Sequence, residues 1–565
     1  MSADFTTPAF SHPATGWHSI DWETCHRRVR ELQVRIAKAT KGKRWRQVKK
    51  LQRMLVRSFS AKALAVRRVT ENRGRKTAGI DGETWGTPNS KWEAISRLQR
   101  KGYKPRPLRR VFIPKSDGSR RPLGIPTMLD RAMQALYLLA LEPVSETQAD
   151  ANSYGFRPMR STADAIEQLF VNLSRSSSAK WVLEGDIKGC FDNIDHDWLI
   201  RNVRMDRAVL QKWLKAGYME SGSLHPTGAG TPQGGIISPV LANIALDGLE
   251  EVLLSNFGRK NTKAAYKTKV NYVRYADDFV ITGISRELLE EEVRPLVSAF
   301  MAERGLELSA KKTVVTLVED GFDFLGQNVR TYRGKMFIKP SRKSVQNVLR
   351  KIRDLVKRMA TAPTHKLIAA LNPIIRGWAN YHRHCVAKET FNYLDYRIWK
   401  LVWRWCKRRH NNRRKRWIKE KYFPVLGTRK WCFSAKLGSG SRISLLYASD
   451  IAIQRHTKIK GAANPFDPEW AMYFEKRSEY TWRNSTEGQK RVNALYRRQG
   501  GCCPMCNMRI TWETGWDIHH IHFRGKGGTD LMSNLVMLHP NCHRQYHSLC
   551  GDDISEAEVA GSTLG

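Results

Sequence analysis

Three aspartates in the first half of the chain have the placement of ligands for divalent metal ions. Asp277 and Asp278 stand between runs of β-branched and aromatic residues at 270–274 and 279–282, so we expect the pair in the tight turn of a β-hairpin. Asp186 ends another apolar strand. Alone, an Asp-Asp pair is also typical of a solvated loop. Together, three carboxylates from two strands can hold two Mg²⁺ ions roughly 3.5–4 Å apart, which activate a hydroxyl and stabilise a phosphate leaving group.

A second group of reactive side chains lies near the C-terminus. The last 65 residues hold five of the ten cysteines and six of the 16 histidines, which indicates metal ligation in a reducing compartment. Cys503-Pro-Met-Cys506 and His539-Pro-Asn-Cys542 have the spacing of the two halves of a tetrahedral zinc site. Cys502 or Cys550 could replace one member of that set.

Four further histidines could form a catalytic metal site. His543 and His547 are four residues apart, so on a helix they face the same way and can bind one cation with His519. His520 would then be unliganded, and its neutral imidazole beside a phosphodiester could deprotonate water. The alternative is a zinc ribbon that only stabilises this tail or binds DNA.

The segments that must position these residues show two kinds of sequence pattern, one β-rich and one helical. Short β-rich runs alternate with helical segments between residues 111 and 325, which predicts an α+β domain with an antiparallel sheet. Residues 25–74 and 341–422 have the apolar periodicity of basic amphipathic helices. At roughly 150 residues per domain, 565 residues suggest three or four domains.

The charge of the chain points to a polyanionic partner. With 97 basic and 53 acidic side chains the formal net charge is +44, and nucleic acid is the commonest partner for such an excess, with a membrane surface the weaker alternative. Residues 404–416 carry eight Lys or Arg and no acid. Tryptophans interleave with them, and we leave open whether Trp399 and Trp403 stack on RNA bases or pack in a core. Because the N-terminus lacks an apolar leader and no apolar stretch could span a bilayer, we expect a soluble intracellular protein with no membrane partner.

Three ordered motifs resemble those of a reverse transcriptase of the group II intron type. They are Asp186-Ile-Lys-Gly-Cys-Phe-Asp-Asn-Ile-Asp-His196, Gly230-Thr-Pro-Gln-Gly-Gly-Ile-Ile-Ser-Pro239 and Tyr275-Ala-Asp-Asp278. Residues 371–382 and the run to Tyr422 resemble the maturase domain, and residues 502–548 resemble the HNH, or ββα-metal, endonucleases. Nearly the whole chain therefore resembles a group II intron-encoded protein.

The resemblance implies an α+β fold with right-hand polymerase fingers and palm, an α-helical thumb and maturase domain, and a small zinc-stapled ββα-metal domain. We expect five regions: a basic helical extension at 1–75, fingers and palm at 76–335, thumb and maturase domain X at 336–437, a DNA-binding region at 438–490, and the HNH endonuclease at 491–565.

The resemblance also implies roles for residues of the polymerase. Asp186, Asp277 and Asp278 would hold two Mg²⁺ ions. Lys115 and Arg121 would grip the triphosphate of a dNTP, although both could be hairpin-surface charge. The remaining nucleotide-binding assignments are Phe191, which would exclude a 2′-hydroxyl, Gln233 against the incoming nucleotide, and Lys312, which would assist the leaving group. Phe324-Leu-Gly326 resembles the turn that grips the primer.

In the tail and thumb the implied roles are as follows. His520 would be the general base and Asn534 would brace its loop, while His519, His543 and His547 would bind Mg²⁺ or another divalent ion. Cys503, Cys506, His539 and Cys542 would bind structural Zn²⁺, although the family commonly has a cysteine where His539 stands. RNA contacts would come from Arg376, Arg404, Arg408, Arg409, Arg413, Arg414 and Arg416.

The implied function has three linked parts. The protein would bind its intron RNA and assist splicing, nick target double-stranded DNA, and copy the intron from the new 3′-hydroxyl during intron mobility (retrohoming). It would act as a ribonucleoprotein in the cytoplasm of a bacterium or in an organelle, associated with the nucleoid. The alternatives are a cellular reverse transcriptase repurposed for immunity or diversification, and an RNA-binding maturase without mobility.

Overall fold

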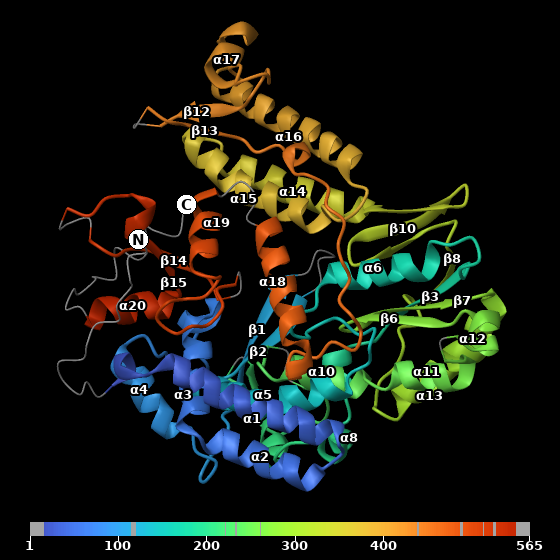
Figure 1. The fold of residues 1–565 in the computed structure, drawn as a ribbon. Helices are drawn as coiled ribbons and strands as arrows, with labels where there is room; N and C mark the ends of the chain where they lie inside the picture. The colour runs from blue at the N-terminus through green and yellow to red at the C-terminus, as the bar shows by residue number, and fades with distance from the viewer. Residues whose placement is uncertain are drawn as a thin grey trace.

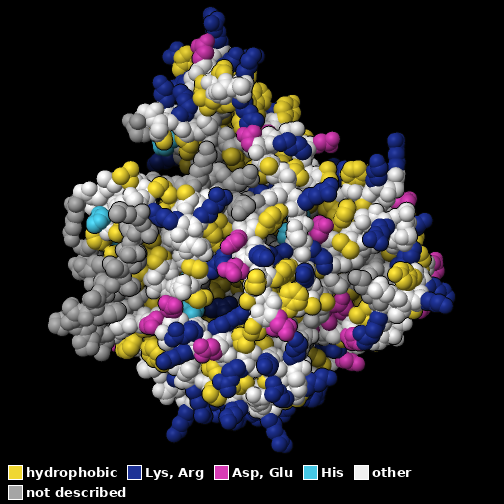
Figure 2. Space-filling model, viewed as in Figure 1, with side chains coloured by type: hydrophobic (Ala, Val, Ile, Leu, Met, Phe, Trp, Pro, Cys, Tyr) yellow, Lys and Arg dark blue, Asp and Glu magenta, His cyan; other side chains and the backbone are white. Residues whose placement is uncertain are grey.

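The computed structural model describes residues 16–114, 120–220, 222–231, 234–259, 261–437, 440–485, 490–511, 514–523 and 527–549. Figure 1 shows the N-terminal helices at the base of the molecule, the palm to one side, and the thumb helices projecting at the top. The C-terminal tail returns to lie beside the N-terminal helices. Lys and Arg side chains cover much of this face and gather along the lower edge and on the projecting thumb (Figure 2).

The N-terminal region is a helical bundle, as its periodicity predicts. Its helices are α1 (Trp22–Lys41), α2 (Trp45–Arg57), α3 (Phe59–Glu71) and α4 (Pro88–Arg97), and α5 (Met128–Gln148) packs against them. The Asp21 carboxylate caps α1 by accepting from the backbone N–H of Thr24 at 3.0 Å. Ser58 both ends α2 and caps α3. The apolar stripes of these helices therefore meet around the almost wholly buried α5.

The fingers contain a sheet of order β2-β1-β4-β5. It comprises β1 (Leu108–Pro114), β2 (Arg120–Ile125), β4 (Tyr218–Glu220) and β5 (Ser223–His225). β1 and β2 form an antiparallel hairpin in which Pro114 pairs with Arg120. Lys115, at the tip between them, lies outside the described residues.

The palm is built on an antiparallel sheet of order β6-β7-β3-β8, which confirms the α+β prediction. Its strands are β3 (Trp181–Asp186), β6 (Asn271–Tyr275), β7 (Asp278–Gly283) and β8 (Val314–Leu317). Around it lie α6 (Thr162–Leu173), α7 (Cys190–Asn193), α8 (His196–Asn202), α9 (Arg207–Leu214), α10 (Ser238–Leu246), α11 (Leu249–Phe257), α12 (Lys263–Thr268), the π-helix η3 (Leu288–Val293) and α13 (Arg294–Ala302). Because helices cover the sheet, the central strand β7 is buried from Phe279 to Gly283.

A three-stranded sheet of order β11-β10-β9 joins the palm to the thumb. Its strands are β9 (Phe322–Phe324), β10 (Gln327–Tyr332) and β11 (Lys335–Pro340). The thumb contains α14 (Arg342–Arg358), α15 (Thr364–His382), α16 (Lys388–Arg409) and α17 (Lys415–Tyr422), followed by the hairpin β12 (Ser434–Lys436) and β13 (Arg442–Ser444). These helices and the hairpin share a separate hydrophobic core.

After an extended segment, the tail contains α18 (Ala471–Ser485), α19 (Lys490–Arg498), β14 (Asp517–His520), β15 (Leu535–Leu538) and α20 (Pro540–Leu549). β14 and β15 pair antiparallel and α20 packs on both strands, which gives the expected ββα arrangement. The buried tail residues join the same hydrophobic cluster as the N-terminal helices. This packing of the two chain ends against each other was not predicted from the sequence.

Candidate active sites

The hairpin β6–β7 brings the palm aspartates together. Tyr275 pairs with Asp278 across the turn, and Asp278 pairs with Asp186 on β3. Burial, reinforced by the charges of Asp277 and Asp186, raises the pKa of Asp278 to about 6. The three carboxylates are therefore close enough for their charges to interact, and an oxygen donor set of this kind suits Mg²⁺.

Lys312 reaches the same site from a neighbouring loop. Its Nζ lies 3.2 Å and 3.1 Å from the two carboxylate oxygens of Asp186. The loop is held against β3 because the Ser309 N–H donates to the Asp186 carbonyl at 2.8 Å. The Lys312 side chain remains 69% exposed, so the ammonium lies at the open edge of the site.

The acidic turn is clamped by backbone that comes from residues 152–156. Arg274 exchanges backbone hydrogen bonds with this segment, donating to the Asn152 carbonyl and accepting from Tyr154, both at 2.9 Å. A Cβ at Gly155 would stand 2.2 Å from the backbone nitrogen of Ala276, so glycine is required where the two chains touch. Ala276 itself has φ of 59°, which makes this support necessary.

The Arg274 guanidinium holds the turn from inside. Its side chain is fully buried and donates to Asn243 Oδ1 at 3.0 Å, to the Ala276 carbonyl at 3.3 Å and to the Asp247 carboxylate. Burial raises the pKa of Asp247 to about 7, against the opposing effect of Arg274. Asn243 in turn donates to the Gly155 carbonyl at 2.9 Å. The fork therefore links α10 and its C-terminal end to the catalytic turn.

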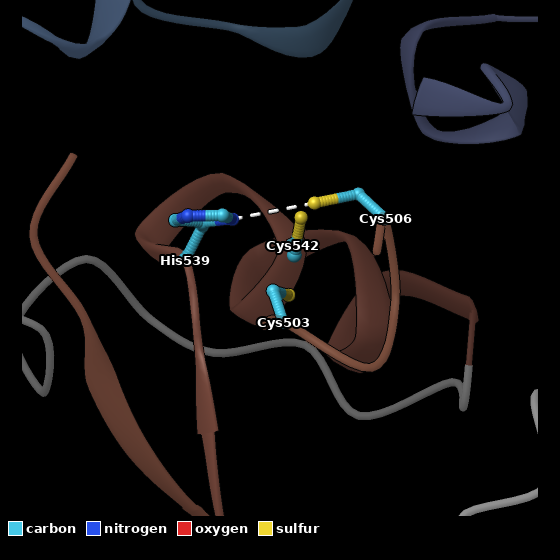
Figure 3. A group of neighbouring side chains, drawn as sticks. All are labelled: Cys503, Cys506, His539 and Cys542. Carbon is cyan, nitrogen blue, oxygen red and sulfur yellow. Dashed lines mark hydrogen bonds between the residues drawn. The ribbon is translucent and has the colours of Figure 1, made fainter. Parts of the chain in front are cut away.

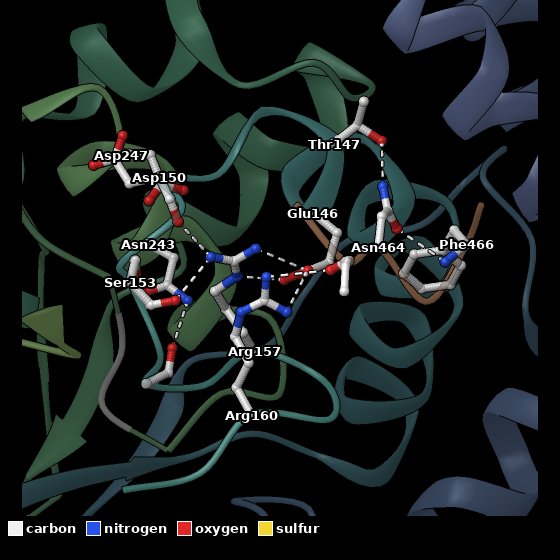
Figure 4. Close-up of polar contacts among 12 residues, drawn as sticks. Glu146, Thr147, Asp150, Ser153, Arg157, Arg160, Asn243, Asp247, Asn464 and Phe466 are labelled. Carbon is white, nitrogen blue, oxygen red and sulfur yellow. Dashed lines mark hydrogen bonds and ion pairs between the residues drawn. The ribbon is translucent and has the colours of Figure 1, made fainter. Parts of the chain in front are cut away.

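Figure 4 shows a network of buried charges together with Asn243 and Asp247, two residues to which Arg274 donates. Arg157 forms two hydrogen bonds to the Glu146 carboxylate, at 2.5 Å and 3.0 Å, and also donates to the carbonyls of Asp150 and Ser153. The Asp150 carboxylate accepts from the backbone of Gly248 and Glu250. With each charge paired or hydrogen-bonded, the network can lie under the active site without an uncompensated ion.

Phe191 is half-buried and lies near the loop of residues 230–234. The Thr231 N–H donates to the Phe191 carbonyl at 2.6 Å, and a Cβ at Gly230 would stand 2.5 Å from the Asp192 carbonyl. The Phe191 ring meets Phe156 edge-on at 6.0 Å. Gln233 lies outside the described residues, and Arg121 is exposed on β2. The packing thus leaves Phe191 both a core contact and an accessible face.

The turn Phe324–Gly326, which resembles a primer-gripping turn, joins β9 to β10. Leu325 and Gly326 both have positive φ, 50° and 74°. The hydroxyl of Tyr381, on α15, donates to the Leu325 carbonyl at 2.8 Å. The thumb is thereby tied to the edge of the palm.

The thumb separates its aromatics from its arginines. Trp399 and Trp403 stack at 5.8 Å in a cluster with Phe423 and Trp431, and Trp405 is buried, so these rings belong to the core. The seven arginines proposed for RNA contact are all exposed: Arg376, Arg404, Arg408, Arg409, Arg413, Arg414 and Arg416. Some also have protein partners, since Arg409 donates to the Ala362 carbonyl and Arg416 pairs with Glu420.

The tail histidines form a compact group across β14 and α20. The ring nitrogens of His519, His543 and His547 lie within 4.8 Å of one another. Burial, with the neighbouring imidazoles, lowers the pKa of His519 to about 3, so it is neutral at physiological pH and able to ligate. The Asp517 carboxylate lies 3.3 Å from His543 Nδ1, which orients that ring with Nε2 toward His519.

His520 follows His519 on β14, so its side chain lies on the opposite face of the strand. Its Nε2 lies 2.7 Å from the Asp530 carboxylate. Asn534 is buried and braces the intervening loop: its Nδ2 donates to the carbonyls of His522 and Thr529, and its Oδ1 accepts from the His522 N–H at 2.7 Å. Asn534 thus contacts the loop and not the histidine group.

The four proposed zinc ligands also meet. Cys503, Cys506, His539 and Cys542 are all buried, with their ligand atoms within 4.8 Å of one another (Figure 3). Hydrogen bonds with the neighbouring thiols lower the pKa of Cys503, and the thiolate form is the one that binds metal. Cys502 points elsewhere, toward the Gly500 carbonyl, and Cys550 lies outside the described residues. Three sulfurs and one imidazole fit tetrahedral Zn²⁺.

The thiol cluster is also where the tail meets the N-terminal helices. Arg67, buried on α3, donates to the Cys542 sulfur at 3.7 Å and pairs with Glu71. Trp17 donates to Asn541 at 3.2 Å, and Gln545 donates to the carbonyls of His18 and Ile20. These contacts join the nuclease region to the first helices of the chain.

Sequence reasoning missed three supporting residues: Arg274, Gly155 and Asp517. Arg274 had a detectable signal, because it is a cation within the apolar strand that leads into the acidic turn. Asp517 likewise starts the strand that carries the histidines. Gly155 gave no such signal, since its role depends on a contact 121 residues away along the chain.

Comparison with known proteins accounts for most of the chain. Residues 17–98 match the N-terminal domain of reverse transcriptase, and residues 113–329 match reverse transcriptase (RNA-dependent DNA polymerase). Residues 345–423 match the group II intron maturase-specific domain, and residues 503–549 match HNH endonuclease.

Two curated proteins illustrate the similarity. Protein YkfC of Escherichia coli (strain K12) is 34% identical over 311 residues, which cover 48% of this chain and 81% of YkfC. The group II intron-encoded protein LtrA of Lactococcus lactis subsp. cremoris is 28% identical over 556 residues, which cover 81% of this chain and 88% of LtrA.

These matches agree with the fold, the palm carboxylates and the ββα tail. Together they define a reverse transcriptase that also carries a maturase domain and an HNH endonuclease. It is thus an RNA-directed DNA polymerase and an endonuclease on one chain. The chain belongs to the group II intron-encoded proteins. The alternative of a repurposed cellular enzyme is not favoured. Among the helices of the described residues, none has the length and apolarity to cross a bilayer.

Proposed function

We propose that the protein supports a complete cycle of intron mobility. The thumb arginines and N-terminal helices bind the intron RNA and assist its splicing, the tail cuts one strand of target double-stranded DNA, and the palm extends the new 3′-hydroxyl with dNTPs. The observation that carries this proposal is the presence, in one chain, of a three-carboxylate palm site and a three-histidine ββα site. The cut made by the tail supplies the 3′-hydroxyl that the palm extends.

In the palm, Asp186, Asp277 and Asp278 would hold two Mg²⁺ ions, which supply Lewis acidity at the attacking and leaving oxygens. Lys312, already beside Asp186, can donate a proton to the pyrophosphate as it departs. Phe191 would exclude a ribose 2′-hydroxyl by volume. Lys115, Arg121 and Gln233 complete the proposed nucleotide site.

In the tail, His519, His543 and His547 would hold a divalent ion, which neutralises charge on the leaving oxygen. His520 takes a proton from water, and its pairing with Asp530 orients the ring. Asn534 keeps the loop that follows His520 and carries Asp530 in place. Zn²⁺ on Cys503, Cys506, His539 and Cys542 would be structural, since the cluster is buried.

The region boundaries follow from the same proposal. Residues 1–75 and 336–437 serve RNA, residues 76–335 polymerise, residues 438–490 contact DNA, and residues 491–565 cut it. α18, in the DNA-contact region, lies between the thumb and the N-terminal helices (Figure 1), where a duplex directed to the nuclease would pass. The protein would act in the cytoplasm or an organelle, associated with the nucleoid as a ribonucleoprotein.

The experiment uses the purified full-length chain, RNA transcribed from the sequence flanking its reading frame, and end-labelled duplex DNA containing the spliced-exon junction. We expect RNA insertion into one strand, a cut in the other, and cDNA that begins at the cut. Cleavage without RNA, or cDNA that does not begin at the cut, would contradict the proposed cycle.

A further inference from the structure

A large hollow outside the active sites lies between the N-terminal helices and the fingers. Its volume is about 1040 Å³, at the upper end of the range for small-molecule sites. The walls come from α2, α5, the residues that follow α4, and the junction of α8 with α9. None of the palm aspartates, tail histidines or thumb arginines lines it.

The rim of this hollow is strongly cationic. Nine Lys or Arg side chains line it, against a single acid, Asp206. Asp206 is itself engaged, because it pairs with Arg100 at 2.5 Å and caps α9. Lining residues such as Arg53 and Arg57 are exposed on α2. The uncompensated charge makes the rim complementary to phosphates.

Apolar side chains and Tyr137 form the floor of the hollow. Val48, Leu98, Met133 and Leu136 are buried there. Tyr137 is only 5% exposed, and its hydroxyl forms no hydrogen bond with any residue in the described ranges. Burial and the Asp206 carboxylate raise the pKa of Tyr137 to about 12, so the hydroxyl keeps its proton and remains a donor.

One wall offers a further surface for a planar ligand. The indole of Trp45 is partly buried, and the Arg204 guanidinium lies 5.0 Å from the centre of its ring. Aromatic rings and guanidinium planes are the surfaces on which unpaired bases stack in protein–RNA complexes. An unpaired nucleotide combines an apolar face, a polar edge and an anionic backbone. Its face matches the apolar floor, its edge matches the Tyr137 hydroxyl, and its phosphates match the cationic rim.

We propose that this hollow captures an unpaired nucleotide of the partner RNA, with its base on the apolar floor beside Tyr137 and the flanking phosphates on the rim. The inference rests on the proposed RNA partner and adds that the protein recognises an unpaired nucleotide of this RNA. An acidic peptide would satisfy the rim but leave the floor and the Tyr137 hydroxyl unused, so RNA is the occupant that the whole hollow favours.

The test compares two RNA hairpins that differ only in one bulged uridine. We expect the full-length protein to bind the bulged hairpin about tenfold more tightly than the fully paired one. The double variant Arg53→Gln/Arg57→Gln should lose that preference and lower the salt dependence by about two units of slope. Tyr137→Phe, which removes only the hydroxyl, should weaken bulge binding about fivefold.

The matched control is Arg46→Gln/Lys50→Gln, which removes the same charge from exposed positions of α2 that do not line the hollow. It should keep the preference for the bulge. The thermal unfolding midpoints of all variants should stay close to wild type, since only exposed cations or one hydroxyl are changed. With 5-iodouridine at the bulge, photocrosslinks should map to Trp45 or Tyr137.

Several outcomes would overturn the proposal. They are equal affinity of the wild type for both hairpins, equal losses in the two double variants, crosslinks confined to the thumb, and displacement of the bulge by poly-glutamate that depends on Arg53 and Arg57. If the wild type binds neither hairpin, the RNA partner itself is contradicted, and the proposed function fails with the pocket. Retained but indiscriminate binding overturns the pocket alone.

Discussion

Arg274→Lys tests whether the buried fork beneath the palm turn sets the geometry of the polymerase site. Arg274 is fully buried and bonds to Asp247, to Asn243 Oδ1 at 3.0 Å and to the Ala276 carbonyl at 3.3 Å. Lysine retains the charge for Asp247 but has no planar fork with which to reach the other two acceptors. The substitution therefore separates electrostatic compensation from support of the turn.

The expected size follows from the bonds lost. One charge-assisted hydrogen bond contributes about 1.5–3 kcal/mol, and each 1.36 kcal/mol on the barrier is tenfold in rate. If the loss falls on the placement of Asp277 and Asp278, primer extension should slow by roughly 10- to 150-fold. The Mg²⁺ concentration needed for half-maximal rate should also rise, because displaced carboxylates bind the ions less well.

The assay is steady-state extension of oligo(dT) on poly(rA) across a Mg²⁺ titration, with unfolding midpoints measured in parallel. Arg131→Lys is the matched control, since Arg131 is also buried and bonds the carbonyls of Gly74, Thr77 and Pro126, none of them in the turn. It should lose stability without a change in Mg²⁺ requirement. A folded Arg274→Lys protein with the wild-type rate and Mg²⁺ requirement would refute the reasoning.

The remaining predictions concern the other parts of the molecule. Asp277→Ala with Asp278→Ala should abolish primer extension while RNA-assisted splicing survives; loss of both in a folded protein would show that the functions are inseparable. His520→Ala should slow DNA nicking by at least about 100-fold and leave primer extension intact, so rapid nicking would exclude His520 as the base. Cys503→Ser with Cys542→Ser should remove one zinc per chain, measured by elemental mass spectrometry, whereas Cys502→Ser should not; equal losses would contradict the ligand set. Hydrogen bonding to His456 and the charge of Arg477 lower the pKa of Asp164 to about 2, despite its burial. The ionised carboxylate therefore contributes about 2 kcal/mol to the free energy of unfolding above pH 4, and this contribution is lost as the pH falls toward 2. The unfolding midpoint of Asp164→Asn should therefore lie well below wild type at pH 7 and approach it only near pH 2, and a gap that stays constant would refute this pairing.

Local chemistry in the sequence determined a large part of this protein. The β-branched runs around Asp277 and Asp278 dictate a hairpin with the acids at its turn, because strand and turn preferences act over a few residues. The spacing of His543 and His547 dictates one helix face, and α20 bears this out. The thumb helices follow from their apolar period, although that period could not decide whether Trp399 and Trp403 face the core.

Only the tertiary structure shows which residues from distant segments contact one another. Gly155 touches Ala276, Arg274 reaches α10, and the tail cluster packs on Arg67, over separations of more than a hundred residues in the first and third cases. Such contacts depend on how whole helices and sheets pack, and no local propensity encodes them. The hollow around Tyr137 arises in the same way, from four separate stretches of chain. The types and spacing of the reactive residues thus predicted them from the sequence. The residues that hold them in place could be identified only from the folded chain.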